Sequence, residues 1–211
     1  MIGIRHPIIQ AGMGPYSTNR LAAAAANAGA LGIISTSALV LGVLVPQLIE
    51  VVTDGEKGTI YEVLKKVLYR AKEATKDSKG ILGINCLVSA EMATAAEEIL
   101  RAAIDAKNED PELRERLRVI ITSAGDPVPW AEMIKPSGVK WFHEVPSVRH
   151  ARRCEKAGVD AIIASGHEAG YHVAWEPVHT MVLLPAVVNA VKKPLSLRQE
   201  DSAMGPPSPL L

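Results

Sequence analysis

Short apolar runs that alternate with longer helical segments constrain the fold of this chain more than any other feature. Each run is apolar on both faces and ends in a polar or glycine-containing turn. Strands of this kind are buried on both sides, and their alternation with helices is typical of a parallel sheet in an α/β protein. The six predicted strands are Pro7–Ala11, Leu31–Ser35, Gly80–Leu87, Arg118–Thr122, Val139–His143 and Asp160–Ala164.

Helix signals fill the segments between these runs. Ser, Thr or Pro begins several of them, and Gly29 and Gly158 follow two of them, as capping preferences predict. A closed (β/α)8 barrel and an open doubly wound sheet both fit this pattern, and strand count does not separate them. Helices are predicted over 17–28, 46–52, 59–74, 90–107, 130–134, 147–157 and 180–191.

The charge balance and the cysteines narrow the class of function. The 211 residues carry 23 basic and 23 acidic side chains, whereas a nucleic-acid-binding protein would show a strongly basic face. Cys86 and Cys154 are too few for a disulfide framework, which favours a reducing cytoplasm. We therefore predict a cytoplasmic protein that acts on a small-molecule substrate and binds no nucleic acid.

Residues 21–49 contain no charged side chain, a length that could span a membrane. Gly29, Gly32, the polar cluster Ser35–Ser37 and Pro46 interrupt this stretch. It divides better into a helix, a short strand and a second helix. The first residues also lack a charged segment followed by an apolar run, so we predict neither a membrane span nor a signal peptide.

Polar side chains gather where the predicted strands end. Parallel strands place their carboxyl ends at one edge of the sheet, and α/β enzymes bind their ligands there. We therefore expect a functional site at this edge. The polar residues at the strand ends are Gln10, Asn85, Ser123, His143 and Ser165.

The densest polar segment, His167–His172, follows the sixth predicted strand. It is similar to the helical zinc motif His-Glu-x-x-His, but its histidines are five residues apart. Only a spacing of four keeps two such side chains on one face of a helix. Gly170 also favours a loop, so no metal site is predicted. Glu168 and His172 either line a pocket at the sheet edge or belong to a solvated loop.

Two glycine-containing turns could approach a ligand closely. Gly12, Met13 and Gly14 follow the first strand, and Ala124–Pro127 follow the fourth. Each is either a simple turn or a place where the backbone meets a flat ligand. Neither has the dinucleotide-binding pattern Gly-x-Gly-x-x-Gly. Asn85, at a buried strand end, needs hydrogen-bond partners from the backbone or from a ligand.

Taken in order, these segments resemble the nitronate monooxygenase (2-nitropropane dioxygenase-like) family. Pro7–Met13 is similar to the family's first strand, Gly83–Asn85 to its Gly-Val-Asn, and Thr122–Pro127 to its Ser-x-Gly-x-Pro loop. The clearest likeness is Glu168–His172, which resembles Glu-Ala-Gly-Gly-His. The resemblance covers residues 5–194.

The resemblance implies an FMN-dependent TIM barrel that oxidises alkyl nitronates with O2. His172 would be the catalytic histidine, which would hydrogen-bond a nitronate or remove a proton from a nitroalkane. Tyr171 stands where the family has a glycine, so the substrate site would differ in shape. Flavin-type enoyl-acyl-carrier-protein reductases share these motifs and are an alternative. The residues expected to line the flavin are Gly12, Met13, Asn85, Ala124, Gly125 and Glu168.

The C-terminal residues depart from the resemblance. A TIM barrel has eight units and about 250 residues, whereas about six units are predicted here. We expect a partial barrel over 1–194 and a disordered tail without a strand over 195–211. Codons read one base earlier than those of Leu195–Gly205 permit Val-Ile-Ala and Gly-Gly-Phe-x-Asp-Gly, the family's continuation. We therefore hypothesise a frameshift.

A chain without the last two units would lack the loops that bind the cofactor phosphate in many TIM barrels. We therefore expect weak FMN binding or none, and open sheet edges that lower solubility. A non-catalytic truncated fragment is thus an alternative to a working oxidoreductase. The oligomeric state stays open, with a homo-oligomer among the alternatives.

Overall fold

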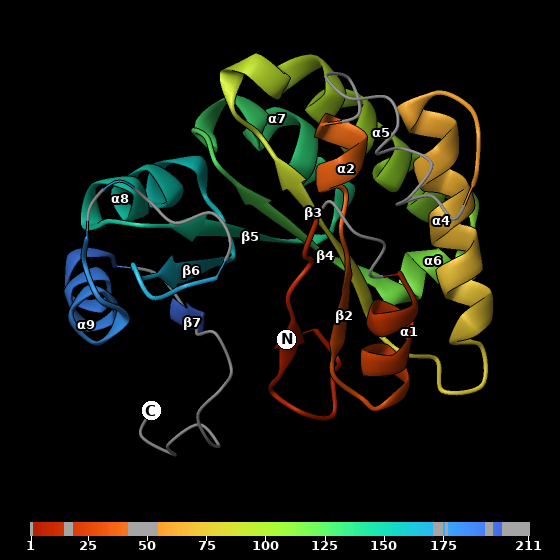
Figure 1. The fold of residues 1–211 in the computed structure, drawn as a ribbon, viewed down its shortest axis with the longest axis horizontal. Coiled ribbons are helices and arrows are strands. Elements are labelled where there is room, and N and C mark those ends of the chain that lie inside the picture. Colours follow the sequence, from red (N-terminus) through yellow and green to blue (C-terminus); the bar gives the residue numbers. More distant parts are fainter. Residues whose placement is uncertain are drawn as a thin grey trace.

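Seven parallel strands, which pair in chain order, organise the computed structural model of the protein (Figure 1). The structure describes residues 2–14, 19–41, 55–170, 175, 177–192 and 196–199, with only the backbone at 41 and 196–199. The strands are β1 Ile9–Gln10, β2 Leu31–Ile34, β3 Leu82–Leu87, β4 Leu117–Ser123, β5 Lys140–Val145, β6 Ala161–Ser165 and β7 Ser196–Gln199.

The strand order decides between the two architectures that the sequence allowed. In a doubly wound sheet, the order of the strands reverses at a switch point, and helices cover both faces of the sheet. Here every strand pairs with the next one along the chain, and the helices pack against one side of the curled sheet. This arrangement is a partial TIM barrel, which confirms the predicted α/β barrel class.

The helices cover the outer face of the sheet (Figure 1). The predicted helix at 46–52 lies outside the described residues. The short α6 was not predicted, although Asp110 caps it and Pro111 begins it, as capping rules favour. The α-helices are α1 Asn19–Asn27, α2 Ser37–Leu41, α4 Ile60–Ala74, α5 Ala93–Glu109, α6 Pro111–Arg116, α7 Ala131–Ile134, α8 Val148–Ala157 and α9 Thr180–Ala190.

Strand alternation divides the core into two layers. On β5, Phe142 belongs to an inner cluster, whereas Trp141 belongs to a larger cluster between the sheet and the helices. On β2, Ile33 points inward and Ile34 points outward in the same way. The barrel interior is therefore a packed core, as in complete TIM barrels. The inner cluster consists of Ile2, Leu31, Ile33, Val119, Ile121, Phe142, Ala161 and Ile163.

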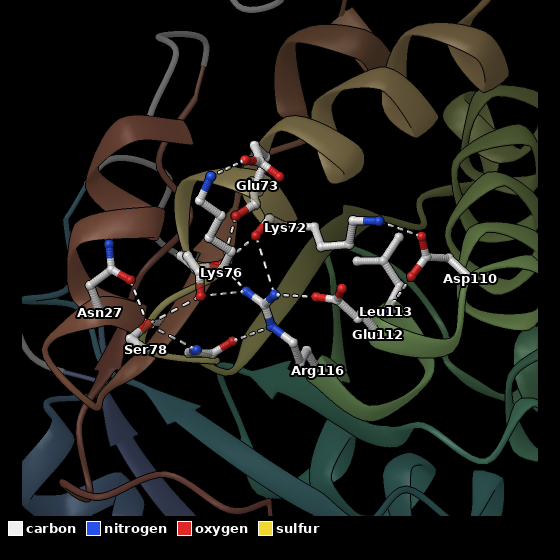
Figure 2. Close-up of polar contacts among 12 residues, drawn as sticks. Asn27, Lys72, Glu73, Lys76, Ser78, Asp110, Glu112, Leu113 and Arg116 are labelled. Atoms are coloured by element: carbon white, nitrogen blue, oxygen red, sulfur yellow. Dashed lines mark hydrogen bonds and ion pairs between the residues drawn. The ribbon is translucent and has the colours of Figure 1, made fainter.

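A buried arginine fastens the end of α4 to the sheet (Figure 2). Arg116, only 4% exposed, donates hydrogen bonds to the carbonyl oxygens of Lys72 at 3.2 Å, Thr75 at 3.0 Å and Gly80 at 3.3 Å. Lys72 and Thr75 end α4, where unpaired carbonyls carry a partial negative charge. Glu112 accepts a further bond from the guanidinium at 3.3 Å. The positive charge therefore stabilises both the helix end and the start of β4.

A short seventh strand lies where the sequence predicted none. β7 pairs in parallel with β6, with Ser196 opposite Ile162 and Gln199 opposite Ser165. The prediction of a tail without a strand is therefore wrong for these four residues. Edge pairing uses backbone N–H and C=O groups and requires no apolar sequence pattern. Residues 200–211 lie outside the described part, and the predicted domain boundary at 194 stays a prediction.

The uncharged stretch 21–49 contributes to α1, β2 and α2 as far as residue 41, and residues 42–54 lie outside the described part. None of the helices within the described ranges is long and apolar enough to cross a membrane.

Candidate functional site

The carboxyl ends of β3 to β6 carry four polar side chains on the inner face of the sheet. Strand alternation places them on the same side as the inner apolar cluster and just beyond it. Together with the loops after β1, β4 and β6, they form the mouth of the barrel. The polar residues are Asn85, Ser123, Glu144 and Ser165, and the apolar ones beneath them are Ile121, Phe142 and Ile163.

Asn85 joins the loops that follow β1 and β2. Its Oδ1 accepts a hydrogen bond from the Thr36 amide at 3.0 Å, and its Nδ2 donates to the Gly12 carbonyl at 3.3 Å. A Cβ on Gly12 would lie 2.9 Å from the Ile33 side chain and 3.1 Å from Asn85, so this approach favours glycine. The structure therefore brings Gly12 and Asn85 together, and the Asn85 side chain has backbone partners.

Met13 follows Gly12 in the loop after β1, and its side chain is exposed to solvent. The side chain is 53% exposed. A thioether is polarisable and packs well against the face or edge of an aromatic ring. Met13 can therefore contact a flat ligand at the mouth.

The loop after β4 contacts the end of β3. Ala124 is exposed and has a left-handed backbone with φ of 57°. A Cβ on Gly125 would lie 2.3 Å from the Val88 carbonyl oxygen, so any larger residue would push the two loops apart. Ala124 and Gly125 thus form a tight turn at the rim, close to the strand that carries Asn85.

His143 supports this turn from the outer face of β5. Its ring is 2% exposed, and its Nδ1 lies 2.7 Å from the Thr122 hydroxyl. Trp141 Nε1 donates to the same hydroxyl at 2.8 Å, and the hydroxyl itself lies 3.4 Å from the Phe142 carbonyl oxygen, to which it can donate. Burial lowers the pKa of His143 to about 4, although a hydrogen bond to the Gly125 backbone opposes the shift. The prediction of His143 as a rim side chain is therefore wrong, because the ring lies on the outer face of β5 beneath the rim.

Glu168 follows β6 and caps α9. Its Oε1 accepts a hydrogen bond from the Thr180 amide at 2.8 Å, and its Oε2 lies 3.4 Å from His179 Nδ1. Hydrogen bonds from its own amide and from Thr180 hold the pKa of this carboxyl below its usual range. Gly166 permits the approach, because a Cβ there would lie 2.3 Å from the Thr180 nitrogen. Glu168 therefore anchors the loop that begins at the mouth.

His172, the predicted catalytic residue, lies outside the described residues, as does Tyr171. The residues on either side of this segment are described. The His167 amide donates to the Val178 carbonyl at 2.8 Å, so the loop starts and ends beside β6. The catalytic role of His172 stays a prediction.

Glu144 is a residue of the mouth that the sequence analysis missed. It is half-buried near the end of β5, and burial raises the pKa of its carboxyl, while a hydrogen bond with Ser165 partly opposes this shift. It stands two residues beyond Phe142, whose side chain belongs to the inner cluster. Alternate residues of a strand share a face, so an inner-core Phe142 implies an inward Glu144.

A cavity of about 340 Å³ lies at the opposite end of the barrel, beside the start of β2 and β3. Gly3, Arg5, Asn27 and Lys79 are among its lining residues. Conserved features at this face of TIM barrels serve stability, whereas chemistry takes place at the carboxyl ends of the strands. Across the described ranges, no group of three His, Cys, Asp or Glu side chains could hold a metal ion.

Comparison with known proteins identifies the family of the chain. The family model for nitronate monooxygenase matches residues 1–196. The chain belongs to the nitronate monooxygenase family. This confirms the resemblance drawn from the strand-end motifs.

Among the relatives of this family member is a 5-hydroxy-7a-methyl-1-oxo-octahydro-1H-indene-4-carboxyl-CoA dehydrogenase of Rhodococcus jostii, 27% identical over 92% of this chain and 45% of the relative. A probable nitronate monooxygenase of Staphylococcus aureus is 29% identical over 92% of this chain and 58% of the relative. The structure of FabK from Thermotoga maritima aligns with a TM-score of 0.68 at 28% identity, over 92% of this chain and 50% of that one. The chain thus spans about half the length of these relatives.

The mouth of this nitronate monooxygenase family member fits a flat cofactor such as FMN. Exposed Met13 and the left-handed Ala124 turn stand on two loops of the rim. Between them, Asn85 and Ser123 supply amide and hydroxyl groups on the inner face. These groups could hold the edge of a ring by hydrogen bonds and its face by apolar contact.

Proposed function

We propose that this domain is the flavin-binding part of an oxidoreductase that oxidises alkyl nitronates with O2. The observation that carries the proposal is the convergence of the family's motifs on one mouth. Gly12 and Gly125 lie in the loops after β1 and β4, and Asn85 lies near the end of β3. Gly12 contacts Asn85, while Gly125 packs against Val88 just beyond β3. The family match over residues 1–196 and the probable nitronate monooxygenase among the relatives support the same reaction.

Several described residues would contribute to FMN binding, each through a different contact. Met13 would pack against the isoalloxazine ring, while Gly12 and the Ala124–Gly125 turn would let the backbone approach it. Asn85 would keep the first two loops in place through its bonds to Gly12 and Thr36. Glu168 would hold the loop at the flavin rim by capping α9.

FMN, when bound, would supply the redox chemistry between the nitronate and O2. The protein would orient the substrate and would accept the proton that a nitroalkane loses. We propose that His172 faces the substrate, where an imidazole can hydrogen-bond a nitronate oxygen or accept the proton of a nitroalkane. The cytoplasm is the compartment that the cysteine content favours, and a small molecule is the proposed substrate.

A thioester oxidoreductase is the second candidate, since one relative is named a carboxyl-CoA dehydrogenase. The flavin-type enoyl-acyl-carrier-protein reductases raised by the motifs belong to this class. Such an enzyme would exchange electrons with NAD(P)H or a thioester rather than with a nitronate. A third candidate is a non-catalytic domain that keeps the fold alone.

Flavin titration and anaerobic reduction separate these candidates. We expect weak but saturable quenching of FMN fluorescence by the purified chain, and still weaker quenching in Gly125→Val, with circular dichroism as the control for folding. Ethyl nitronate should then bleach the flavin absorbance without NADH. Bleaching by NAD(P)H or a thioester alone would favour the second candidate. Absence of saturable FMN binding would favour the third.

A further inference from the structure

The cavity at the amino-terminal end of the barrel takes no part in the proposed function. Its volume of about 340 Å³ lies within the range of small-molecule sites. Three segments form its wall, namely residues 3–5 before β1, residues 26–30 around the end of α1, and residues 78–81, which lead into β3. A ligand bound here would therefore connect three segments that lie apart in the sequence.

The charged side chains that line this cavity are both positive. They belong to Arg5 and Lys79, and the described lining residues include no Asp or Glu. Within the described ranges, neither cation forms an ion pair with a carboxylate. The chain carries equal numbers of basic and acidic side chains, so this positive charge is a local excess. Two positive charges that share one small cavity attract an anion.

The helix ends beside the cavity do not cancel this charge. The C-terminal end of a helix is partly negative where its last carbonyl groups lack donors. At the end of α1, the amides of residues 28–30 donate to the carbonyls of residues 24–26. At the end of α4, Asn27 Nδ2 donates to the Ala74 carbonyl at 3.1 Å, and the Arg116 guanidinium binds two further carbonyls (Figure 2). These carbonyls already have donors, so the cavity does not require a cation as its ligand.

Lys79 has a backbone conformation that is rare for a residue with a side chain. Its φ is 50°, in the left-handed region. The residues on either side are held in place, because the Gly80 amide donates to Ser78 Oγ at 3.0 Å and Ser78 Oγ donates to Asn27 Oδ1 at 2.5 Å (Figure 2). A glycine would adopt this conformation with less strain, so a lysine at this position points to a use for its charge.

We propose that this cavity binds a small organic dianion, such as a dicarboxylate, between Arg5 and Lys79. Two cations match two carboxylates, and a guanidinium can donate two parallel hydrogen bonds to one of them. Ile4, Ala30 and Ile81 also line the cavity and supply apolar surface for the carbon atoms of the ligand. The site lies at the opposite end of the barrel from the mouth, so this inference does not depend on the proposed reaction.

Succinate and succinamide form a matched pair of probes, since their shapes are similar and only succinate is charged at neutral pH. NMR titration of the full chain, labelled with nitrogen-15 in its glycines and kept at constant ionic strength, should show saturable shifts of the Gly3, Gly29 and Gly80 amides. Succinamide should not shift them, and Gly12 and Gly125 at the mouth should stay unchanged. The proposal fails if no saturable shift occurs, if succinamide acts equally, or if succinate shifts only the mouth glycines.

Variants of the two cations test which side chains hold the anion. Arg5→Gln and Lys79→Gln should each weaken succinate binding about tenfold, because each removes one of the two charges. The control is Arg20→Gln, which removes an exposed cation of α1 that does not line the cavity and should leave binding unchanged. Unshifted resonances of the mouth glycines verify the fold of each variant. Equal succinate affinities in the wild type and all three variants, or an equal loss in Arg20→Gln, would overturn the proposal.

Discussion

His143 illustrates how a single buried side chain can serve a site without touching it. Its ring connects the Thr122 hydroxyl to the Gly125 turn, and Trp141 completes the network. All three side chains are almost fully buried. Burial disfavours a charge here more than the Asp126 carboxylate favours it, so the network requires a neutral imidazole.

This requirement predicts a pH-dependent stability. The pKa of His143 falls from 6.5 to about 4 in the folded protein, so between these values the unfolded state binds more protons. Stability is therefore complete above pH 6.5 and declines as the pH falls toward 4, by about 3 kcal/mol at most. Urea unfolding at several pH values should show a smaller acid loss in His143→Gln than in the wild type. His6→Gln, which changes an exposed histidine, should keep the wild-type slope.

At the scale of elements, Arg116 links the C-terminal end of α4 to the residue just before β4. Replacing it in Arg116→Met leaves the α4 carbonyls of Lys72 and Thr75 without their charged donor. We expect a loss of about 3 kcal/mol in the free energy of unfolding measured with urea. Arg118→Met changes an exposed arginine two residues along, and it should cost less than about 0.5 kcal/mol. Equal losses of stability in the two variants would contradict this role of Arg116.

The close approach of α9 to β6 requires a glycine at position 166, because a side chain there would collide with the helix. A Cβ at Gly166 would lie 2.3 Å from both the amide nitrogen and the hydroxyl of Thr180. Gly166→Ala should therefore displace the first turn of α9 and weaken its cap by Glu168. Hydrogen exchange should become faster in α9, while the amides of α4 serve as the internal reference. Unchanged protection in α9 would show that the helix start can move without loss.

The sequence predicted the first six strands because each is an apolar run between turn signals. It could not predict β7, since an edge strand needs backbone pairing and no particular side chains. It also could not tell which side of a strand faces the interior. That choice separates His143 from Glu144, two adjacent residues, and only the packing of Phe142 and Trp141 in different clusters decides it. Asn85 was recognised as needing partners, but their identity required the fold.

At the scale of the whole molecule, β1 and β7 form the two edges of the described sheet. Unpaired edge groups can pair with another chain, which favours self-association. Ile8, 55% exposed beside β1, adds an apolar side chain to that edge. Ile8→Lys should reduce association measured by light scattering at constant stability. Leu21→Lys removes a similarly exposed residue, 46% exposed on α1, and should have a smaller effect. The edge hypothesis fails if both variants act equally.

The chain order of the strands has a consequence for how the protein is made. Within the described sheet, no strand waits for a partner that is synthesised much later, since each strand after β1 pairs with its immediate predecessor. Pairing with the preceding strand keeps the loop-closure cost lower than pairing with a more distant strand would, although every parallel pair still needs a crossover connection. The sheet can therefore grow on the ribosome one unit at a time, in the order in which the units emerge. During that growth the newest strand is always the exposed template for the next, so a slow step in translation would lengthen the time for which that edge is open to other chains.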